Sequence, residues 1–400
     1  MKCVQISGAY VGAQKTIERA IHKELVTRRY GSFVFYAVGC ADDLGIKCYE
    51  TKTASFFRRG LRKLFGKTPL FAYWSTCQLI KQLQKYQPDL VHLHTLHQGY
   101  LDYSRLFRYL ESAGVPVVYT LHDMWPFTGG CYYYTETTCA GFLTGCINCP
   151  AQPSKIDNAI SKTAYYHRKK REFFDSLASL HFVAVSDWVR TEAKKSFLAK
   201  YPITVIENGI DFLDWNVSFD NNTPKRIISV AATWDERKGV KRIFKIAEIL
   251  GEEYQFDLVG RFSEAIKGSA PSNVHFLGYI ESKEKLMELY AKADLHLSAS
   301  LEETFGMTFI EAASVGTRSV GYDSTAVSST LKGVYGIISP EKSEKSMANT
   351  IRDTLGQKEY KLSEFEREAV KMRYSSKSMA EKYCDLYVDI LSDKVGNHGE

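Results

Sequence analysis

The 400-residue sequence lacks any run of 18 or more apolar residues, and its strand-like start, Met1–Ser7, lacks the long apolar core of a signal peptide. These absences predict that the chain has no transmembrane helix, and we expect an intracellular, cytoplasmic protein. Hydrophobic residues make up 44% and charged residues 24%, which excludes wholesale disorder. The length suits two domains better than one.

Two patterns of other enzyme classes are also missing. The first loop, Ser7–Lys15, has isolated glycines rather than the spaced triple-glycine fingerprint of dinucleotide-binding domains, which argues against a dehydrogenase. The sequence contains no convincing Asp-x-Asp clamp for a divalent metal. We therefore expect catalysis to require no cofactor.

The charge is distributed unevenly along the chain. Residues 1–200 contain 27 Lys and Arg against 15 Asp and Glu, a net charge of +12, whereas residues 201–400 contain 25 against 31, a net charge of −6. This asymmetry indicates two units with different partners, and the basic first half should meet an anionic one.

Strand-like apolar runs alternate with helix-length amphipathic segments along the whole chain. This alternation predicts an α/β fold with two Rossmann-like, doubly wound domains of parallel strands. The polar stretch 214–224 separates a first domain over residues 1–214 from a second over 215–370, followed by a helical segment over 371–400. The expected strands are Lys2–Ser7, Ser32–Val38, Asp89–His94, Val115–Leu121, Leu180–Ser186, Thr204–Glu207, Arg226–Ala232, Gln255–Val259, Val274–Leu277, Leu295–Ala299, Arg318–Gly321 and Gly336–Ile338. The expected helices include Thr16–Arg28, Tyr103–Ser112, Val240–Leu250, Lys283–Ala293 and Leu362–Leu391.

The strongest motif spans residues 300–313, directly after the expected strand Leu295–Ala299. Glu303 lies in the loop, a helix should begin near Phe305 or Gly306, and Glu311 falls about two turns into that helix. The free amides of a helix N-terminus can bind a diphosphate or sugar hydroxyls, and flanking carboxylates can accept hydrogen bonds from vicinal hydroxyls. A helix-capping acid with a solvated glutamate would explain Glu303 alone, but it explains the whole pattern poorly.

The Glu-x7-Glu spacing with Phe-Gly after the first glutamate resembles the retaining GT-B transferases of glycosyltransferase family 4. The resemblance implies two domains facing a central cleft, with the C-terminal helix returning to the first domain. It also implies a nucleotide-sugar donor on the second domain and a glycan or polyprenyl-linked acceptor on the first. Further segments similar to that family follow in the same order along the chain: Val183–Ser186, Glu207–Asp211, Trp234–Gly239, Val259–Arg261 and Phe276–Ile280.

The resemblance also implies roles for single residues. Glu311 should bind the donor ribose and the catalytic Glu303 the transferred sugar, while Lys238 with Arg237 should hold the diphosphate, whose charge grows as it departs. A solvated turn is the alternative for Arg237. Many family members have an arginine where this chain has Ala231–Thr233, so Arg237 or Arg261 is the candidate substitute. The donor-binding set is completed by Gly260, Arg261, Phe305, Gly306 and Met307.

Three histidines, His94, His97 and His122, stand at expected strand ends of the first domain. Metal ligation and structural burial are possible interpretations, but no acidic partner set for a metal accompanies them. Members of the resembled family commonly have a histidine near the donor sugar. By that resemblance we expect His122 to be a neutral, catalytic hydrogen-bonding group, oriented by Asp123.

Four of the nine cysteines, Cys131, Cys139, Cys146 and Cys149, form Cys-x7-Cys-x6-Cys-x2-Cys. The last pair has the spacing of zinc ligands, so a structural zinc is our favoured interpretation, with free thiols or a disulfide as alternatives. The remaining cysteines have no motif spacing and are expected to be buried small hydrophobes. They are Cys3, Cys40, Cys48, Cys77 and Cys384.

The segment Lys52–Pro88 has eight basic residues and no acid, and its first part, Lys52–Lys67, has an apolar helical face. This pattern favours an interfacial helix on an anionic membrane, and the basic, aromatic stretch Tyr165–Phe174 points the same way. An ordinary surface helix is the alternative. We expect no nucleic-acid partner, and we expect a peripheral location at the inner face of the membrane.

Together these features predict a retaining hexosyltransferase-like enzyme that transfers a sugar from a nucleotide-sugar donor to a glycan or lipid-linked acceptor in cell-surface polysaccharide synthesis. A sugar-nucleotide epimerase of the same architecture is one alternative. A non-catalytic nucleotide-sugar-binding subunit is the other, motivated by the departures at Ser7–Lys15 and Ala231–Thr233.

Overall fold

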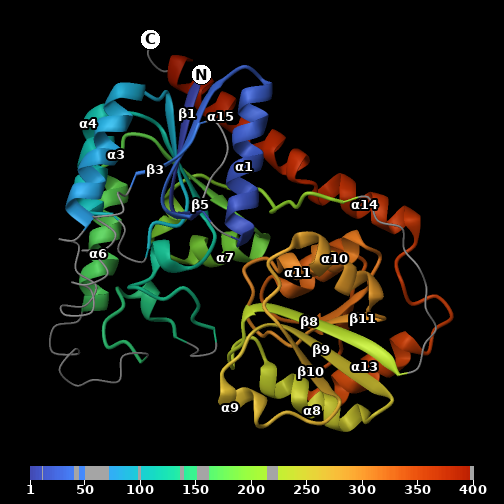
Figure 1. Ribbon diagram of the computed structural model, residues 1–400. Coiled ribbons are helices and arrows are strands. Elements are labelled where there is room, and N and C mark those ends of the chain that lie inside the picture. The colour runs from blue at the N-terminus through green and yellow to red at the C-terminus, as the bar shows by residue number, and fades with distance from the viewer. Residues whose placement is uncertain are drawn as a thin grey trace. The chain divides into compact units, whose positions relative to one another are not determined.

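The computed structural model describes residues 1–10, 12–39, 45–49, 72–97, 101–135, 139–150, 162–213 and 224–396. The chain divides into two compact units, each built on one parallel sheet (Figure 1). Unit 1 comprises Met1–Gly209 together with Ser376–Glu400, and unit 2 comprises Ile210–Ser375. Each unit is therefore an α/β domain built on a parallel, Rossmann-like sheet, as the sequence predicts.

The sheet of unit 1 has seven strands in the order β3-β2-β1-β4-β5-β6-β7, and every pairing is parallel. The central strands β4 and β5 are buried over their whole length, as expected for a sheet covered on both faces. The strands are β1 (Lys2–Tyr10), β2 (Gly31–Gly39), β3 (Ile46–Cys48), β4 (Leu90–Leu93), β5 (Val117–Leu121), β6 (Leu180–Ala184) and β7 (Ile203–Val205).

The helices of unit 1 include one from the far end of the sequence, α15, which packs against α1 (Figure 1). Ile17, Ile21 and Leu25 of α1 share a buried cluster with Tyr383 and Tyr387 of α15. Each large apolar side chain buried in this way stabilises the folded unit by roughly 1.5–3 kcal/mol, so α15 is an integral part of unit 1. The helices are α1 (Gly12–Thr27), α3 (Tyr73–Tyr86), α4 (Tyr103–Ala113), α6 (Lys162–Asp175), α7 (Asp187–Lys195) and α15 (Ser376–Gly396), with short 3-10 turns η2 (Trp125–Phe127), η3 (Gly141–Leu143) and η4 (Phe197–Lys200).

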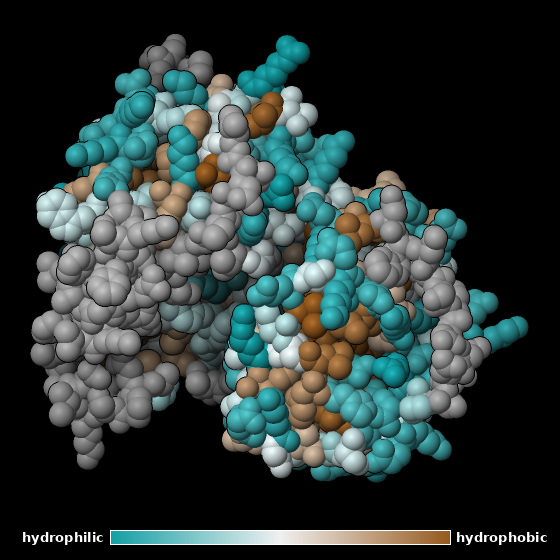
Figure 2. Space-filling model, in the orientation of Figure 1, coloured by the Kyte–Doolittle hydropathy of each residue, from teal (hydrophilic) through white to brown (hydrophobic). Residues whose placement is uncertain are grey.

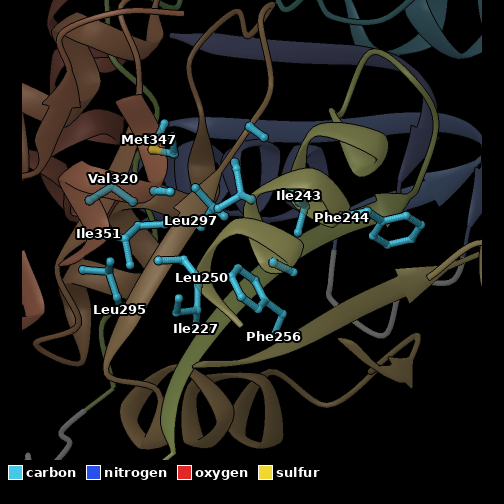
Figure 3. Packing of buried hydrophobic residues seen from close by; sticks show 14 of the residues in the cluster. Ile227, Ile243, Phe244, Leu250, Phe256, Leu295, Leu297, Val320, Met347 and Ile351 are labelled. Atoms are coloured by element: carbon cyan, nitrogen blue, oxygen red, sulfur yellow. The ribbon is translucent and has the colours of Figure 1, made fainter. Parts of the chain in front are cut away.

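Unit 2 has a six-stranded parallel sheet in the order β10-β9-β8-β11-β12-β13. Its core joins apolar side chains of β8, β9 and β11 to those of α8 and α13, as Figure 3 shows for Ile227, Phe256, Leu297, Ile243 and Met347. The strands are β8 (Lys225–Thr233), β9 (Tyr254–Arg261), β10 (Val274–Gly278), β11 (Leu295–Ser298), β12 (Ser319–Tyr322) and β13 (Ile337–Ser339). The helices are α8 (Val240–Leu250), α9 (Glu264–Lys267), α10 (Lys283–Lys292), α11 (Met307–Ser314), α12 (Val327–Gly333), α13 (Glu344–Leu355) and α14 (Glu364–Tyr374).

The unit boundaries differ by several residues from the expected 214 and 370. The Ile210 N–H donates to the Tyr374 carbonyl at 2.9 Å, and Ile210 also forms a bridge with Ser375. These backbone bonds tie both crossing segments to unit 2, so the chain changes unit after Gly209 and again after Ser375. The expected helix Leu362–Leu391 is likewise interrupted at Ser375, which is extended.

All twelve expected strands coincide with observed ones, and β3 was missed. This edge strand has three residues, of which Ile46 alone is buried, so it lacks an apolar run. Among the described residues, no helix combines the length and the apolarity that crossing a membrane would require. The surface in Figure 2 is mostly hydrophilic where the structure is described, with a hydrophobic area on unit 2 between hydrophilic residues.

Candidate active site

A close backbone contact fixes the turn that follows β8 in unit 2. Gly239 has a φ of +75° and precedes α8. A Cβ at Gly239 would lie 2.3 Å from the Ala299 carbonyl oxygen at the end of β11, so a side chain there would force the two segments apart. Because β8 and β11 are neighbouring parallel strands, this contact holds the turn against the loop after β11.

Lys238, one residue before that glycine, forms an ion pair with Glu303. Its Nζ lies 2.5 Å from Glu303 Oε1, and the two side chains are 22% and 15% exposed. The backbone holds both ends, since the Lys238 N–H donates to Asp235 Oδ1 at 2.9 Å and the Glu303 N–H donates to Thr325 Oγ1 at 3.0 Å. Two residues 65 positions apart in the sequence are thus brought together at the carboxyl edge of the sheet.

Arg237 takes part in the same turn mainly through its backbone. Its carbonyl accepts a hydrogen bond from Ser300 Oγ at 3.4 Å, and its guanidinium lies 3.9 Å from the Asp235 carboxylate. The guanidinium is largely covered, with 21% of the side chain exposed. The Arg237 side chain is thus partly buried, whereas Asp235 and Glu236 of the same turn are exposed.

The N-terminus of α11 lies directly after Glu303 in the chain. Gly306 precedes the helix with a φ of +93°, and a Cβ there would lie 2.6 Å from the Phe309 ring. Phe305 is buried, and its carbonyl accepts from Thr330 Oγ1 at 2.6 Å, which anchors the turn from the other side. The first amides of α11, beginning at Met307, have no carbonyl partner within the helix and can bind an anion.

Glu311 lies on α11 about one turn beyond those amides. Tyr290 OH donates to Glu311 Oε2 at 3.3 Å. Burial raises the pKa of the Glu311 carboxyl to about 7, although the Tyr290 hydrogen bond and Lys283 act to lower it. A carboxyl group this strongly desolvated is an effective hydrogen-bond acceptor for a hydroxyl once it is ionised.

Gly260 and Arg261, at the end of β9, have contacts of a different kind. Gly260 has a φ of +140°, and a Cβ there would lie 2.0 Å from the Ala231 carbonyl oxygen and 2.9 Å from Trp234 Nε1. The Arg261 guanidinium lies 3.8 Å above the Tyr279 ring. Gly260 therefore permits the packing of β9 against β8, and Arg261 has no ion-pair partner among the described residues.

Unit 1 places histidines at the carboxyl ends of its two central strands. His94 follows β4, His122 follows β5, and His94 Nδ1 lies 3.0 Å from His122 Nε2. His97 Nε2 lies 2.8 Å from Asp123 Oδ2, and the other Asp123 oxygen accepts from the Trp125 N–H. The expectation that Asp123 orients His122 is therefore wrong, because Asp123 bonds His97 and the partner of His122 is His94.

The histidines at this edge, His92, His94 and His122, have hydrogen-bond partners that the sequence pattern did not reveal. Gln5 of β1 bonds His94, while Thr120 and Tyr387 bond His92. Gln5, Thr120 and His92 are polar residues inside apolar strands, which is a usable signal, whereas Tyr387 comes from α15 and has no local signal at all. Burial lowers the pKa of His122 to about 4, against the opposing effect of Asp123, so its ring is neutral at pH 7.

The segment that contains Cys131, Cys139, Cys146 and Cys149, here called the cysteine loop, has thiols that accept backbone hydrogen bonds. The Gly129 N–H donates to Cys146 Sγ at 3.0 Å, and the Gly141 N–H donates to Cys139 Sγ at 3.3 Å. Burial, and then Cys149, Cys146 and Cys139, raise the pKa of Cys131 to about 11. None of the described cysteines forms a disulfide, and no group of three Cys, His, Asp or Glu among the described residues is arranged so that it could hold a metal ion.

The scattered cysteines differ from one another. Cys3 and Cys384 are fully buried, as expected, and Cys77 is half-buried. Cys48 is exposed on the edge strand β3, so the expectation of burial is wrong there. Cys40 lies outside the described residues.

The basic segment Lys52–Lys67 also lies outside the described residues, but α6 is described. This helix exposes Tyr165 and Tyr166 and buries Lys170 and Phe174, so the stretch Tyr165–Phe174 does not form one continuous solvated face. Beside it is an open cavity of about 580 Å³ whose lining contains three cations and no carboxylate. The lining residues are Phe142, Leu143, Thr144, Gly145, His167, Arg168, Arg171, Lys195, Ser196 and Phe197.

Comparison with known proteins covers both units. Residues 21–212 match the family model described as Glycosyltransferase Family 4, and residues 212–372 match that described as Glycosyl transferases group 1. The putative colanic acid biosynthesis glycosyl transferase WcaC of Escherichia coli K12 is 25% identical over 323 residues, which are 76% of this chain and 77% of that relative.

Two further proteins are similar over different lengths. The N,N'-diacetylbacillosaminyl-diphospho-undecaprenol alpha-1,3-N-acetylgalactosaminyltransferase of Campylobacter jejuni is 24% identical over 200 residues, 48% of this chain and 52% of that relative. The structure of Anabaena HepE in complex with UDP and glucose has a TM-score of 0.65 at 15% identity, covering 97% of this chain and 100% of that one.

The substitution Glu311→Gln should remove a pH dependence of stability. The folded protein holds a proton on Glu311 up to a pKa of about 7, whereas the ordinary value is 4.5. The contribution of this proton to the free energy of unfolding is fully present below about pH 4.5. It is lost as the pH rises from there through 7, which lowers the free energy of unfolding by roughly 1–3 kcal/mol. Urea denaturation across this range should show a steeper fall for wild type than for Glu311→Gln. Parallel curves would contradict the prediction, and Glu264→Gln, at an 88% exposed side chain, is the control.

The zinc interpretation of Cys131, Cys139, Cys146 and Cys149 stays a prediction. Four thiolates would bind about one zinc ion per chain and draw the sulfur atoms into a tetrahedron. Elemental analysis of protein purified without added metal should find that zinc, and Cys146→Ser with Cys149→Ser should abolish it. Zinc-free protein with all four thiols open to titration would contradict the prediction, and Cys48→Ser is the control for an exposed cysteine outside the loop.

Proposed function

Because the chain belongs to the GT-B glycosyltransferases of glycosyltransferase family 4, we propose that it transfers a sugar from a nucleotide-sugar donor to a glycan or polyprenyl-linked acceptor, with retention of the anomeric configuration. The observation that carries this proposal is the Lys238–Glu303 ion pair next to the free N-terminus of α11. It presents a cation, a carboxylate and backbone amides at one carboxyl edge. Those are the groups that a sugar diphosphate requires.

The proposed donor site divides these groups between the two parts of the ligand. Lys238 and the amides from Phe305 to Met307 bind the diphosphate, with Arg237 beside them. Lys238 then exchanges its carboxylate partner for phosphate oxygens, which leaves Glu303 to accept hydrogen bonds from the transferred sugar. Glu311 accepts from the ribose hydroxyls. The complex of Anabaena HepE with UDP and glucose supports a nucleotide-sugar ligand for this fold.

The proposed reaction keeps the anomeric configuration because the leaving group acts as the base. The bond from the anomeric carbon to the diphosphate oxygen breaks, and the acceptor oxygen bonds that carbon from the same face. The acceptor proton moves to the departing diphosphate oxygen, so no protein base is needed. Lys238 and the helix amides stabilise the charge of the diphosphate, and for this reason we propose that no divalent ion takes part.

The proposed acceptor is anionic and bound by unit 1, whose part of the sequence has an excess of basic residues. The names of the Escherichia coli and Campylobacter jejuni relatives point to polysaccharide and undecaprenol-diphosphate chemistry. We therefore propose a role in cell-surface polysaccharide synthesis. These relatives are glycosyl transferases by name, which does not favour the epimerase or the non-catalytic alternative.

The substitution Lys238→Ala should lower kcat by roughly 10²–10³, because it removes a cation from the leaving group. Lys241→Ala is the matched control, since this lysine lies on the first turn of α8 with 71% of its side chain exposed. Turnover is measured with nucleotide sugars and a diphosphate-linked acceptor in the presence of EDTA. Proton NMR of the product should show the donor's anomer. Equal rates for the two variants, or an inverted product, would refute the proposed mechanism.

We propose that the basic stretch Tyr165–Phe174 contacts an anionic membrane, and this contact can be tested on the exposed arginines of α6. Arg168 and Arg171 line the cavity beside α6, with 69% and 60% of their side chains exposed. At about 1 kcal/mol for each basic residue near an anionic surface, Arg168→Ala with Arg171→Ala should weaken vesicle binding roughly 30-fold. Sedimentation with anionic and neutral vesicles measures this. The pair Lys245→Ala with Lys292→Ala on unit 2 is the control, and an equal effect of both pairs would contradict the contact.

A further inference from the structure

Three side chains on neighbouring strands of unit 1 form a hydrogen-bonded chain that ends at His122. Gln5 lies on β1, His94 follows β4 and His122 follows β5, and these strands are adjacent in the sheet. Gln5 Oε1 lies 3.0 Å from His94 Nε2, and His94 Nδ1 lies 3.0 Å from His122 Nε2. The register pairs Gln5 with His92 and His92 with Val118, so the three side chains lie at successive levels along the strands and connect diagonally across the sheet.

The direction of this chain is fixed at its inner end. Gln5 Nε2 donates to the Glu18 carbonyl at 3.1 Å, and a carbonyl can only accept. The Gln5 oxygen is therefore the atom that faces His94, and it too can only accept, so the hydrogen of His94 is on Nε2. Burial keeps the pKa of His94 well below its ordinary value, so the ring is neutral and its Nδ1 is a lone pair. That lone pair requires a hydrogen on His122 Nε2.

We propose that Gln5 and His94 are positioning residues that hold His122 as the Nε2–H tautomer, so that the nitrogen left for a ligand is the acceptor Nδ1. Among the described residues, no hydrogen bond to His122 Nδ1 is found, and His122 as a residue is partly exposed. The tautomer follows from unit 1 alone. Its use toward a sugar hydroxyl rests on the proposed function, in which His122 accepts a hydrogen bond and does not act as a general acid.

The groups around His122 keep it neutral as well as oriented. Burial has the largest effect and lowers its pKa, Asp123 raises it, and His97 lowers it, with a result of about 4. His94, which follows β4, contacts the His122 ring, and the equally buried His92 ring lies 3.9 Å from that of His94. His92 is itself held by Tyr387 OH at 2.6 Å and Thr120 Oγ1 at 2.8 Å. The tautomer should therefore be unchanged at pH 7 and throughout the neutral range.

The tautomer can be read directly from the ring nitrogens of the full-length protein without any ligand. Long-range proton–nitrogen NMR of protein labelled with nitrogen-15 histidine distinguishes Nε2–H from Nδ1–H, and the His122→Gln variant assigns the signals. Wild type should show His122 as a single Nε2–H tautomer at pH 7. Gln5→Met and His94→Leu should each give a mixture of tautomers. The control Thr204→Val removes another histidine hydrogen bond of the same sheet, to His181, and should leave His122 unchanged.

A wild-type His122 that is Nδ1–H or doubly protonated at pH 7 would overturn the proposal whatever the enzyme's activity. Unchanged His122 signals in folded Gln5→Met and His94→Leu would also overturn it. If the tautomer is as expected, these two variants should lower kcat about three- to tenfold with little change in KM, the range that one neutral hydrogen bond contributes. Since the NMR signals need no substrate, failure of the proposed transfer reaction leaves the tautomer result standing, and the two failures are distinguishable.

Discussion

The contact between Gly239 and the end of β11 is the constraint on which the candidate site of unit 2 depends. A parallel sheet brings the carboxyl ends of β8 and β11 side by side, but it does not by itself decide how near the two following loops approach. The missing side chain of Gly239 allows its backbone to touch the Ala299 carbonyl. Lys238 then reaches Glu303, although the two residues are far apart in the sequence. Without that contact, the same residue types would line the edge as separate solvated charges.

In unit 1, hydrogen bonds rather than close backbone packing hold the side chains at the carboxyl edge of the sheet in place. Its edge carries neutral imidazoles, which have no charge to bring them together, so their order comes from Gln5 and from the hydrogen bonds that run diagonally from β1 past β4 to β5. The C-terminal helix supports this layer, because Tyr387 bonds His92 beneath His94. The C-terminal helix thus stabilises unit 1 and also holds His92, whose ring packs against that of His94.

The sequence was most informative where one short segment contains both a helix or strand pattern and the candidate site residues. Each of the twelve expected strands is an apolar run, and Glu303, Gly306 and Glu311 belong to one strand–loop–helix motif, so local pattern located them. It failed where the deciding partner is distant or where burial depends on the edge. Asp123 adjoins His122 in sequence, yet His94 is the residue that contacts it. Cys48 looks like a core residue by type, but β3 is an edge strand with one buried position.

In the proposed reaction, the weakness of one base, His122, accounts for the retained configuration. His122 presents an acceptor nitrogen, but a histidine whose pKa is about 4 takes a proton from an alcohol far less readily than a base matched to neutral pH. Glu303, which lies beside Lys238, is assigned to the sugar. The remaining strong acceptor in the proposed reaction is the diphosphate oxygen released as the anomeric bond breaks, and its basicity rises at the moment the proton must leave the acceptor. Because that oxygen stays on the face it has just vacated, it can take a proton only from an acceptor on the same face. In this proposal, retention depends on the absence of basicity at His122 as much as on the cation at Lys238.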